Sequence, residues 1–314
     1  MVVRSSGPDP DPEGVKNLFK EYNMTPEIVR RDVAHIRQWM VKQPHFPRIP
    51  ASKEEEINFW IEGFLRLTKN NIEKTKTAVD CYFKGKHIFG EIFSIKDFQA
   101  YLYSNVFDNL FMMLLPKLTP DGLRILLYGV RSENAALFQP MDFFRRMGMV
   151  LDIQQKAGID FTGIHVVIYA RYGTLGHLAQ FDLTMLKKVF KLAKKAYPIR
   201  LKHTHIIYPP TFVEAAVKII KPFLTKKVMS RLSVHKDLQS LWQTLPKEVL
   251  PADLGGELQT LQEIHEMWRD RILDHYDWFQ SNRNLVSDES KRHRKDGKND
   301  KYGQNGTFRK LTLD

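Results

Sequence analysis

The sequence is poor in cysteine: Cys81 is the only one among 314 residues, so no disulfide can form within the chain. No uninterrupted apolar run reaches the roughly 18 residues that a membrane-spanning helix needs. The opening stretch, MVVRSSGPDPDPEG, is polar and turn-rich and lacks the apolar segment of a secretory signal. These absences predict a protein of the reducing cytosol.

The common catalytic signatures are also missing. There is no G-x-S-x-G elbow, P-loop, G-x-G-x-x-G or H-E-x-x-H motif. His203 and His205 alternate on an expected strand and face one side, but a metal site needs further ligands that the sequence does not place. We therefore expect hydrogen-bonded histidines, a buried and unreactive Cys81, no metal, no cofactor and no enzymatic activity.

Positive charge is present and concentrated. The formal net charge is +12, and residues 181 to 236 carry 13 Lys and Arg against Asp182 and Glu214, a local net of +11. Such a window favours an anionic partner, either the phosphates of nucleic acid or those of lipid head groups. A solvated basic face without a partner remains the alternative.

The first third of the chain has helical periodicity. Thr25-Pro26 is a typical helix start, and Pro44 and Pro47 end that segment. A second helix is expected from the capping sequence SKEE at residues 52 to 55, and a third from about residue 71 to 85. Three short amphipathic helices predict a small bundle.

The middle of the chain alternates between strand and helix patterns. Strands are expected at residues 123–128 (LRILLY), 164–169 (IHVVIY) and 201–208 (LKHTHIIY), with helices between them. This order predicts a largely parallel sheet with crossover helices, an α/β fold. A further helix is expected at about residues 257–279, and the charged residues beyond 281 read as a disordered tail containing KRHRK.

Two segments resemble a known family. AYPIRLKHTHIIYPPTFVEAAVKIIKPFLTKKVMSRL (residues 196–232) and LPKEVLPADLGGEL (245–258) are similar to the CRAL-TRIO, or Sec14-like, lipid-binding domain. FLRLTKNNIEKTKTAV (64–79) resembles the helical domain that precedes it. The similarity spans about residues 25–280 and is strongest to the branch of tocopherol and retinaldehyde carriers.

The resemblance implies a division of the chain. It predicts a flexible N-terminus (1–24), a three-helix N-terminal domain (25–88), a CRAL-TRIO domain (89–260), a C-terminal helix (261–280) and a disordered basic tail (281–314). In the CRAL-TRIO domain a mostly parallel sheet would form the floor of a lipid cavity closed by a gate helix.

The gate would be the apolar helix after Pro209-Pro210, residues 211–221, continuing through 222–224. Its apolar face can cover an oily ligand or lie on a membrane, so opening is coupled to membrane contact. An ordinary core helix is the alternative reading of the same apolar stripe. The expected cavity wall consists of Ile168, Phe181, Val189, Leu192, Leu201, Phe212, Val213, Val217 and Ile220.

The resemblance also implies a phosphoinositide site. Arg200, Lys227 and Arg231 fall at the family's basic positions, and Lys202 can add to them. A further family arginine falls on Thr68 here, with Lys69 adjacent. Lys227 and Arg231, four residues apart, would share one helical face.

The expected function is therefore that of an intracellular carrier for a tocopherol-, retinoid- or carotenoid-like lipid. It would be a monomer that docks peripherally on phosphatidylinositol bisphosphate in endosomal or plasma membranes and binds no nucleic acid. YARYG at residues 169–173 replaces the acidic segment of many relatives, so the ligand is not identified. A nucleic-acid-binding module and a lipid-modifying enzyme remain alternatives.

Overall fold

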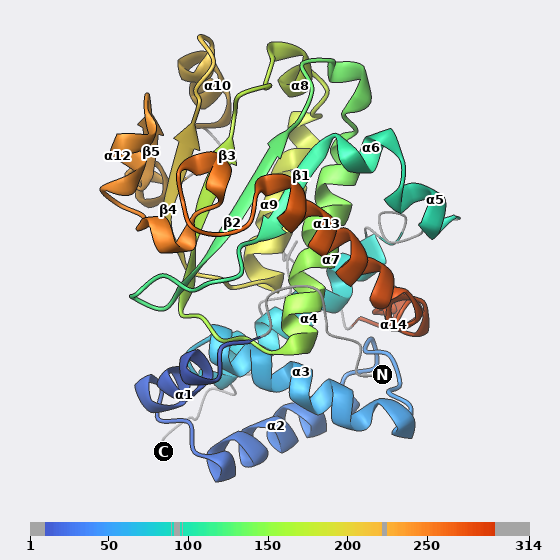
Figure 1. Cartoon of the computed structure of the whole chain (residues 1–314). Coiled ribbons are helices and arrows are strands. Elements are labelled where there is room, and N and C mark those ends of the chain that lie inside the picture. Colours follow the sequence, from blue (N-terminus) through green and yellow to red (C-terminus); the bar gives the residue numbers. More distant parts are fainter. Residues whose placement is uncertain (1–9, 89, 91–94, 96, 222–224, 293–314) are drawn as a thin grey trace, which may run out of the picture.

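The computed structural model describes residues 10–88, 90, 95, 97–221 and 225–292, without the side chains of residues 183, 185, 187, 219 and 220. Its first part is helical, and α1 to α3 lie at one end of the molecule (Figure 1). The helices are α1 (Pro12–Glu21), α2 (Pro26–Val41), α3 (Glu54–Leu67) and α4 (Ile72–Ile88). As predicted, α2 begins at Pro26, where the Thr25 hydroxyl accepts from the Ile28 amide at 3.2 Å.

Residues 12 to 21, which were expected to belong to a flexible N-terminus (1–24), form α1. The Asp11 carboxylate caps this helix by accepting from the amides of Glu13 and Gly14. Leu18 is buried in the main core. The Asp11 amide also donates to the Asp160 carboxylate at 2.7 Å, which fixes the start of α1 against the rest of the chain.

Five strands form one sheet in the order β1-β2-β3-β4-β5. They are β1 (Leu110–Leu114), β2 (Leu123–Val130), β3 (Gly163–Tyr169), β4 (Leu201–Ile207) and β5 (Leu232–His235). β1 pairs with β2 antiparallel, and all other pairs are parallel. The mostly parallel sheet is confirmed, while β1 and β5 were not predicted.

Three crossover connections join the parallel strands. They contain α7 (Pro140–Ala157), then α8 (Leu175–Ala179) with α9 (Leu183–Ala196), then α10 (Val213–Ile220) with α11 (Lys226–Met229). The strands follow one another in a single direction, so right-handed crossovers place these helices over one face of the sheet. We call this the crossover face. Tyr128, which lies on it, packs edge-on against Phe143 of α7 at 5.3 Å.

The opposite face is covered by the C-terminal part of the chain. α12 (Leu238–Trp242) contacts β4 and β5, and α13 (Leu261–Asp274) lies along β1, where the Trp268 indole donates to the Leu114 carbonyl. In the turn between them Gly255 has φ of +68°. A Cβ on Gly256 would lie 2.0 Å from the Leu250 carbonyl oxygen, so only glycine fits this packing.

The remaining short helices are α5 (Phe98–Leu102), α6 (Asn105–Asp108) and α14 (Tyr276–Ser281). The predicted C-terminal helix is therefore divided into α13 and α14. Residues 281 to 292, predicted to belong to a disordered tail, pack on the helical end: Ser287 is buried, and the Arg292 guanidinium donates to Asp80 at 2.9 Å. The rest of that tail prediction lies outside the described residues.

Candidate functional site: an apolar sheet face and a basic edge

The crossover face offers an apolar floor, which we define as Leu126, Tyr128, Val166, Ile168, Thr204 and Ile206. β3 is the central strand, yet Val166 and Ile168 are only half-buried, while their neighbours on the opposite face, His165 and Val167, are buried. Side chains at the centre of a covered sheet are normally excluded from solvent. Their partial exposure on one face alone leaves part of the floor accessible, while Leu126, Thr204 and Ile206 beside them are buried.

Several predicted wall residues surround this floor. Ile168 lies within it, and Phe181, between α8 and α9, packs on Phe138, Phe143 and Phe144 with ring centroids 5.4 to 6.2 Å apart. Val189 of α9 is half-buried against the main core.

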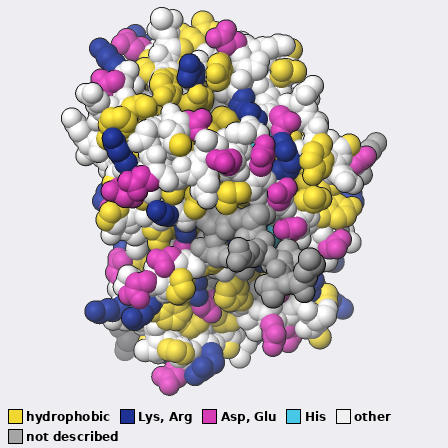
Figure 2. Space-filling view, in the orientation of Figure 1, with side chains coloured by type: hydrophobic (Ala, Val, Ile, Leu, Met, Phe, Trp, Pro, Cys, Tyr) yellow, Lys and Arg dark blue, Asp and Glu magenta, His cyan; other side chains and the backbone are white. Residues whose placement is uncertain are grey.

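The predicted gate helix is present as α10, which lies at the end of the sheet near α8 (Figure 1). Phe212, Val213 and Val217 are half-buried. The Ile220 side chain and residues 222–224 lie outside the described part of the chain. Figure 2 shows hydrophobic side chains gathered toward this end of the molecule, with Lys and Arg between them.

Two predicted wall residues lie elsewhere. Leu192 is buried in the N-terminal helical core, facing Gly85 of α4, so it joins the two parts of the chain rather than facing the floor. The amphipathic α9 presents this side to α4, a contact the helix pattern could not distinguish from a cavity wall. Leu201 is half-buried at the first position of β4, at the basic edge described next.

The basic residues gather where β4 and β5 begin. Because these strands are parallel, the residues just before them, Arg200 and Arg231, lie at one edge of the sheet. The Arg231 guanidinium donates to the Leu201 carbonyl, and its own carbonyl accepts from the Thr204 amide. Lys227 is exposed on α11. α11 ends at Met229, so Lys227 and Arg231 do not share a helix as predicted.

Lys69 joins this edge from the N-terminal helices. Its ammonium lies 5.1 Å from the Tyr22 ring centroid and 3.9 Å from the Glu21 carboxylate. Burial and Glu21 raise the pKa of Tyr22 to about 12, and the nearby charge of Arg200 opposes the rise. Arg200 and Lys69, distant in sequence, are thus neighbours at Tyr22.

Lys202 is also exposed at this edge, 3.7 Å from the Asp121 carboxylate. We call Lys69, Arg200, Lys202, Lys227 and Arg231 the basic patch. Two of its five cations form ion pairs, Lys69 with Glu21 and Lys202 with Asp121, so a positive excess remains. The arrangement suits an anionic surface that can displace these weak, exposed ion pairs.

A chain of histidines crosses the opposite face of the sheet. The Ser240 hydroxyl donates to the Asp237 carbonyl at 2.9 Å and therefore accepts from His235 Nδ1 at 3.0 Å. His235 Nε2 then accepts from His205 Nδ1 at 3.0 Å, and His205 Nε2 from His165 Nδ1 at 2.9 Å.

This histidine chain confirms the expectation of hydrogen-bonded histidines. His203 likewise contacts the Ser233 hydroxyl at 2.8 Å. Burial lowers the pKa of His165 to about 4 and, with the neighbouring imidazoles, that of His205 to about 3. Within the described residues no group of three or more His, Cys, Asp or Glu side chains is arranged to hold a metal ion.

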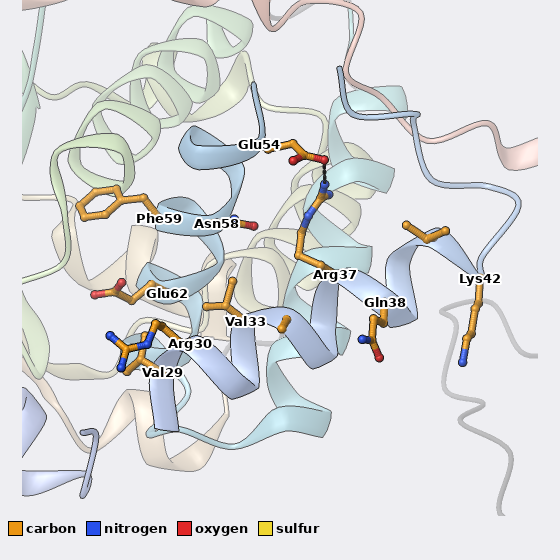
Figure 3. Close-up of a pocket in the computed structure, with 12 residues that line it drawn as sticks. Val29, Arg30, Val33, Arg37, Gln38, Lys42, Glu54, Asn58, Phe59 and Glu62 are labelled. Atoms are coloured by element: carbon orange, nitrogen blue, oxygen red, sulfur yellow. Dashed lines mark ion pairs between the residues drawn. The ribbon is translucent and has the colours of Figure 1, made fainter. Parts of the chain in front are cut away.

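Two surface hollows lie away from the floor. One, of about 720 Å³, separates α2 from α3 and is bordered by the Arg37–Glu54 ion pair at 3.6 Å (Figure 3). The other, of about 520 Å³, lies between α6 and α13 and is lined by Asp108, Arg131 and Arg269. Their charged borders distinguish both from the apolar floor.

Comparison with protein families gives two matches. A model described as "CRAL/TRIO domain" matches residues 109–256, which include all five strands and α10. A model described as "Pinta-like, UBA domain" matches residues 25–101. The chain contains a CRAL-TRIO domain. Members of this family bind hydrophobic ligands, and the fold described above is its Sec14-like α/β arrangement.

The relatives have low sequence identity to this chain but align with most of its length. The chain is 26% identical to mouse "Alpha-tocopherol transfer protein-like" over 79% of this chain and 74% of that protein. It is 23% identical to rat "Clavesin-2" over 84% and 79% of the two chains. The solved structure "Crystal structure of Sfh5" matches with a TM-score of 0.44 and 16% identity, covering 81% of this chain and 91% of that one. Every helix in the described part of this CRAL-TRIO chain is too short or too polar to cross a bilayer.

Proposed function

We propose that this protein carries one hydrophobic lipid above the apolar floor, covered by α10, and exchanges it at phosphoinositide-containing membranes. The observation that supports this most is the partial exposure of Val166 and Ile168 at the centre of the sheet, on the crossover face alone. A bound acyl or isoprenoid chain would remove that apolar surface from water at about 25 cal/mol per Å².

Lipid exchange would follow because the bound lipid and the membrane compete for the apolar side of α10. The α10 side chains Val213, Ala216 and Val217 are half-buried, while Glu214 and Lys218 are exposed. The apolar side of such a helix can face a lipid inside the protein or the acyl region of a bilayer. When the ligand leaves, the acyl region of the membrane can take its place against the apolar side of α10, so membrane contact favours release.

The basic patch would select the membrane. Each Lys or Arg close to an anionic leaflet contributes about 1 kcal/mol to binding. The patch lies where β4 and β5 begin, and these are the two strands that α10 and α11 connect. α11, which carries Lys227 of the patch, follows α10 in the same crossover connection, so part of the patch is joined directly to the covering helix.

The double variant Arg200→Ala, Lys227→Ala tests the docking step. We expect about a 30-fold weaker partition onto vesicles containing phosphatidylinositol bisphosphate, since two contributions of about 1 kcal/mol are lost. Cosedimentation of protein with vesicles measures this, with lipid loading followed in parallel by native mass spectrometry. We expect loading to be unchanged.

A matched control is Lys42→Ala, Lys74→Ala, which removes the same charge from two exposed lysines outside the patch. Equal weakening by both double variants would mean that net charge, not the patch, controls binding. Loss of loading in the Arg200, Lys227 variant would assign these residues a structural role. Tighter binding to a labelled DNA duplex than to vesicles would favour a nucleic-acid-binding protein.

A further inference from the structure

The hollow of about 520 Å³ between α6 and α13 lies where β2 ends and β1 begins (Figure 1). Arg131 follows the last residue of β2, Asn109 precedes the first residue of β1, and the Arg131 amide donates to the Asn109 carbonyl at 2.9 Å. The other border is one side of α13, from which Gln262, Glu266 and Arg269 line the hollow. Because β2 runs parallel to β4 and β5, this end of the sheet is opposite the basic patch.

Three guanidinium groups gather around this hollow. Arg131 and Arg269 border it, and the guanidiniums of Arg269 and of the fully buried Arg146 lie 5.6 and 3.6 Å from the ring centroid of Phe107 in α6. Burial lowers the pKa of His265, and the positive charges of all three arginines lower it further, so the three are close to one imidazole. A place where cations gather in this way attracts an anion.

Carboxylates neutralise only part of this positive charge. Asp108 accepts from Arg269, while Glu266 is exposed and accepts from the Gln262 amide. Arg131 has no ion pair within the described ranges; its guanidinium donates to the Asp108 carbonyl at 2.9 Å and to the Gln262 side chain. Burial and the charge of Arg269 lower the pKa of Arg131, against the opposing effect of Asp108.

Two buried donors at the hollow also lack an acceptor. Asn109 is 5% exposed, and its Nδ2 has no hydrogen-bond partner among the residues that the structure describes. The same holds for Nε of Arg269. Buried donors normally find an acceptor, because one left unpaired costs free energy. The unsatisfied groups are N–H donors, which an oxyanion would complete and a metal cation would not.

From the gathered arginines and the unpaired donors we propose that this hollow binds a water-soluble oxyanion, a small molecule with a phosphate or carboxylate group. The planar guanidinium of Arg131 can donate to such a group, and the Asn109 amide adds a neutral donor beside it. The volume lies within the usual range of small-molecule sites. This site is separate from the apolar floor and from the basic patch, so it does not depend on the proposed carrier function.

Isothermal titration calorimetry of the whole chain with inorganic phosphate, pyrophosphate and citrate tests the site. We expect saturable binding of one equivalent of at least one of these probes. Arg131→Met should weaken it at least 10-fold and Asn109→Leu about 10-fold, the value of one hydrogen bond to a charged group. Since Asn109 Nδ2 has no partner to lose, Asn109→Leu should leave the melting temperature unchanged or raise it.

Arg30→Met is the matched control, because it removes the same charge from an exposed arginine that borders the hollow between α2 and α3. It should leave binding of the probes unchanged. Equal weakening by Arg30→Met and Arg131→Met would mean that net charge alone attracts the anion, and would overturn the site. Absence of saturable binding of all three probes would overturn it as well.

Vesicles containing phosphatidic acid separate a soluble ligand from a lipid head group. Arg131→Met should bind these vesicles as tightly as the unmodified protein does, since the hollow lies at the other end of the sheet from the basic patch. A loss of vesicle binding as large as the loss of phosphate binding would assign the hollow to a lipid head group and overturn the proposed water-soluble ligand.

Discussion

Replacing Asp160 with asparagine is expected to lower the free energy of unfolding by about 3 to 5 kcal/mol. Asp160 and Arg124 form an ion pair whose side chains are 0% and 1% exposed. Burial raises the pKa of Asp160 and lowers that of Arg124, so desolvation already opposes the charged state of both groups. Removing one partner leaves the other charge buried and uncompensated.

The effect extends beyond one pair. Arg124 also donates to the carbonyls of Leu115 and Pro116, at 3.2 and 2.6 Å, and Asp160 accepts from the Asp11 amide at 2.7 Å. One buried pair thus joins the start of α1, the β1–β2 connection and the segment between α7 and β3. Urea unfolding monitored by the five tryptophans measures the loss.

The double variant Arg124→Met, Asp160→Leu separates charge from connectivity. Replacing a whole buried ion pair with apolar side chains is commonly near neutral, so most of the stability should return. A double variant as unstable as Asp160→Asn would show that the backbone contacts dominate instead. In the surface pair Lys16–Glu13, where both side chains are largely exposed, Glu13→Gln should cost at most about 1 kcal/mol.

The predicted strands match the structure closely where burial is greatest. The expected strand at 164–169 corresponds to β3 (Gly163–Tyr169), because a β-branched run that is buried on one face and mostly covered on the other has few alternatives. β1 has the sequence LFMML, whose residues are also common in helices. Its antiparallel pairing with β2 is what identifies it as a strand. β5 has four residues and one buried side chain, too weak a pattern to recognise.

The sequence indicated which residues belong to the candidate site, but not how they are arranged in space. The resemblance pointed to Arg200 and Arg231, and the parallel pairing of β4 and β5 explains why they share an edge. The pattern of α9 could not indicate which apolar side chain faces α4, so Leu192 was misplaced. Tyr128 looked like an ordinary strand residue, because only the register with β3 and the crossovers show which face it occupies.

Acidification from pH 7 to pH 5 is expected to destabilise the protein by several kcal/mol. Burial lowers the folded-state pKa of His165 to about 4, of His205 to about 3 and of His265 to about 2, whereas unfolded histidine titrates near 6.5. Below pH 6.5 the unfolded chain therefore binds protons that the folded chain does not. Each such histidine costs about 1.4 kcal/mol per pH unit until its folded pKa is reached.

Carboxylates oppose this change in part. Burial raises the pKa of Asp142 and Asp152, so the folded chain takes up their protons earlier than the unfolded chain as the pH falls. The histidine contribution begins near pH 6.5, where unfolded histidine titrates, and we expect it to dominate between pH 6.5 and 5. Urea midpoints across this interval measure the slope of stability against pH.

Two variants test whether the histidine chain causes the slope of stability against pH. His205→Leu should flatten it by about one proton, or 1.4 kcal/mol per pH unit, even though it also leaves His165 and His235 without a partner. His87→Asn, at an exposed position, should leave the slope unchanged. Stability that does not vary between pH 7 and 5 would contradict the neutral, buried state of these imidazoles.

The acid effect should first be seen at β5. His235 is the one buried side chain of this four-residue edge strand, and it is bonded to both His205 and Ser240. A proton added to the histidine chain would place positive charge at the buried His235 side chain, and burial destabilises the charged form. Amide hydrogen exchange at pH 5 should therefore accelerate in β5 before β3. α10 and α11 connect β4 to β5. Faster exchange in β5 than in β3 would therefore show that the strand that follows the covering helix is the part of the sheet least resistant to acid.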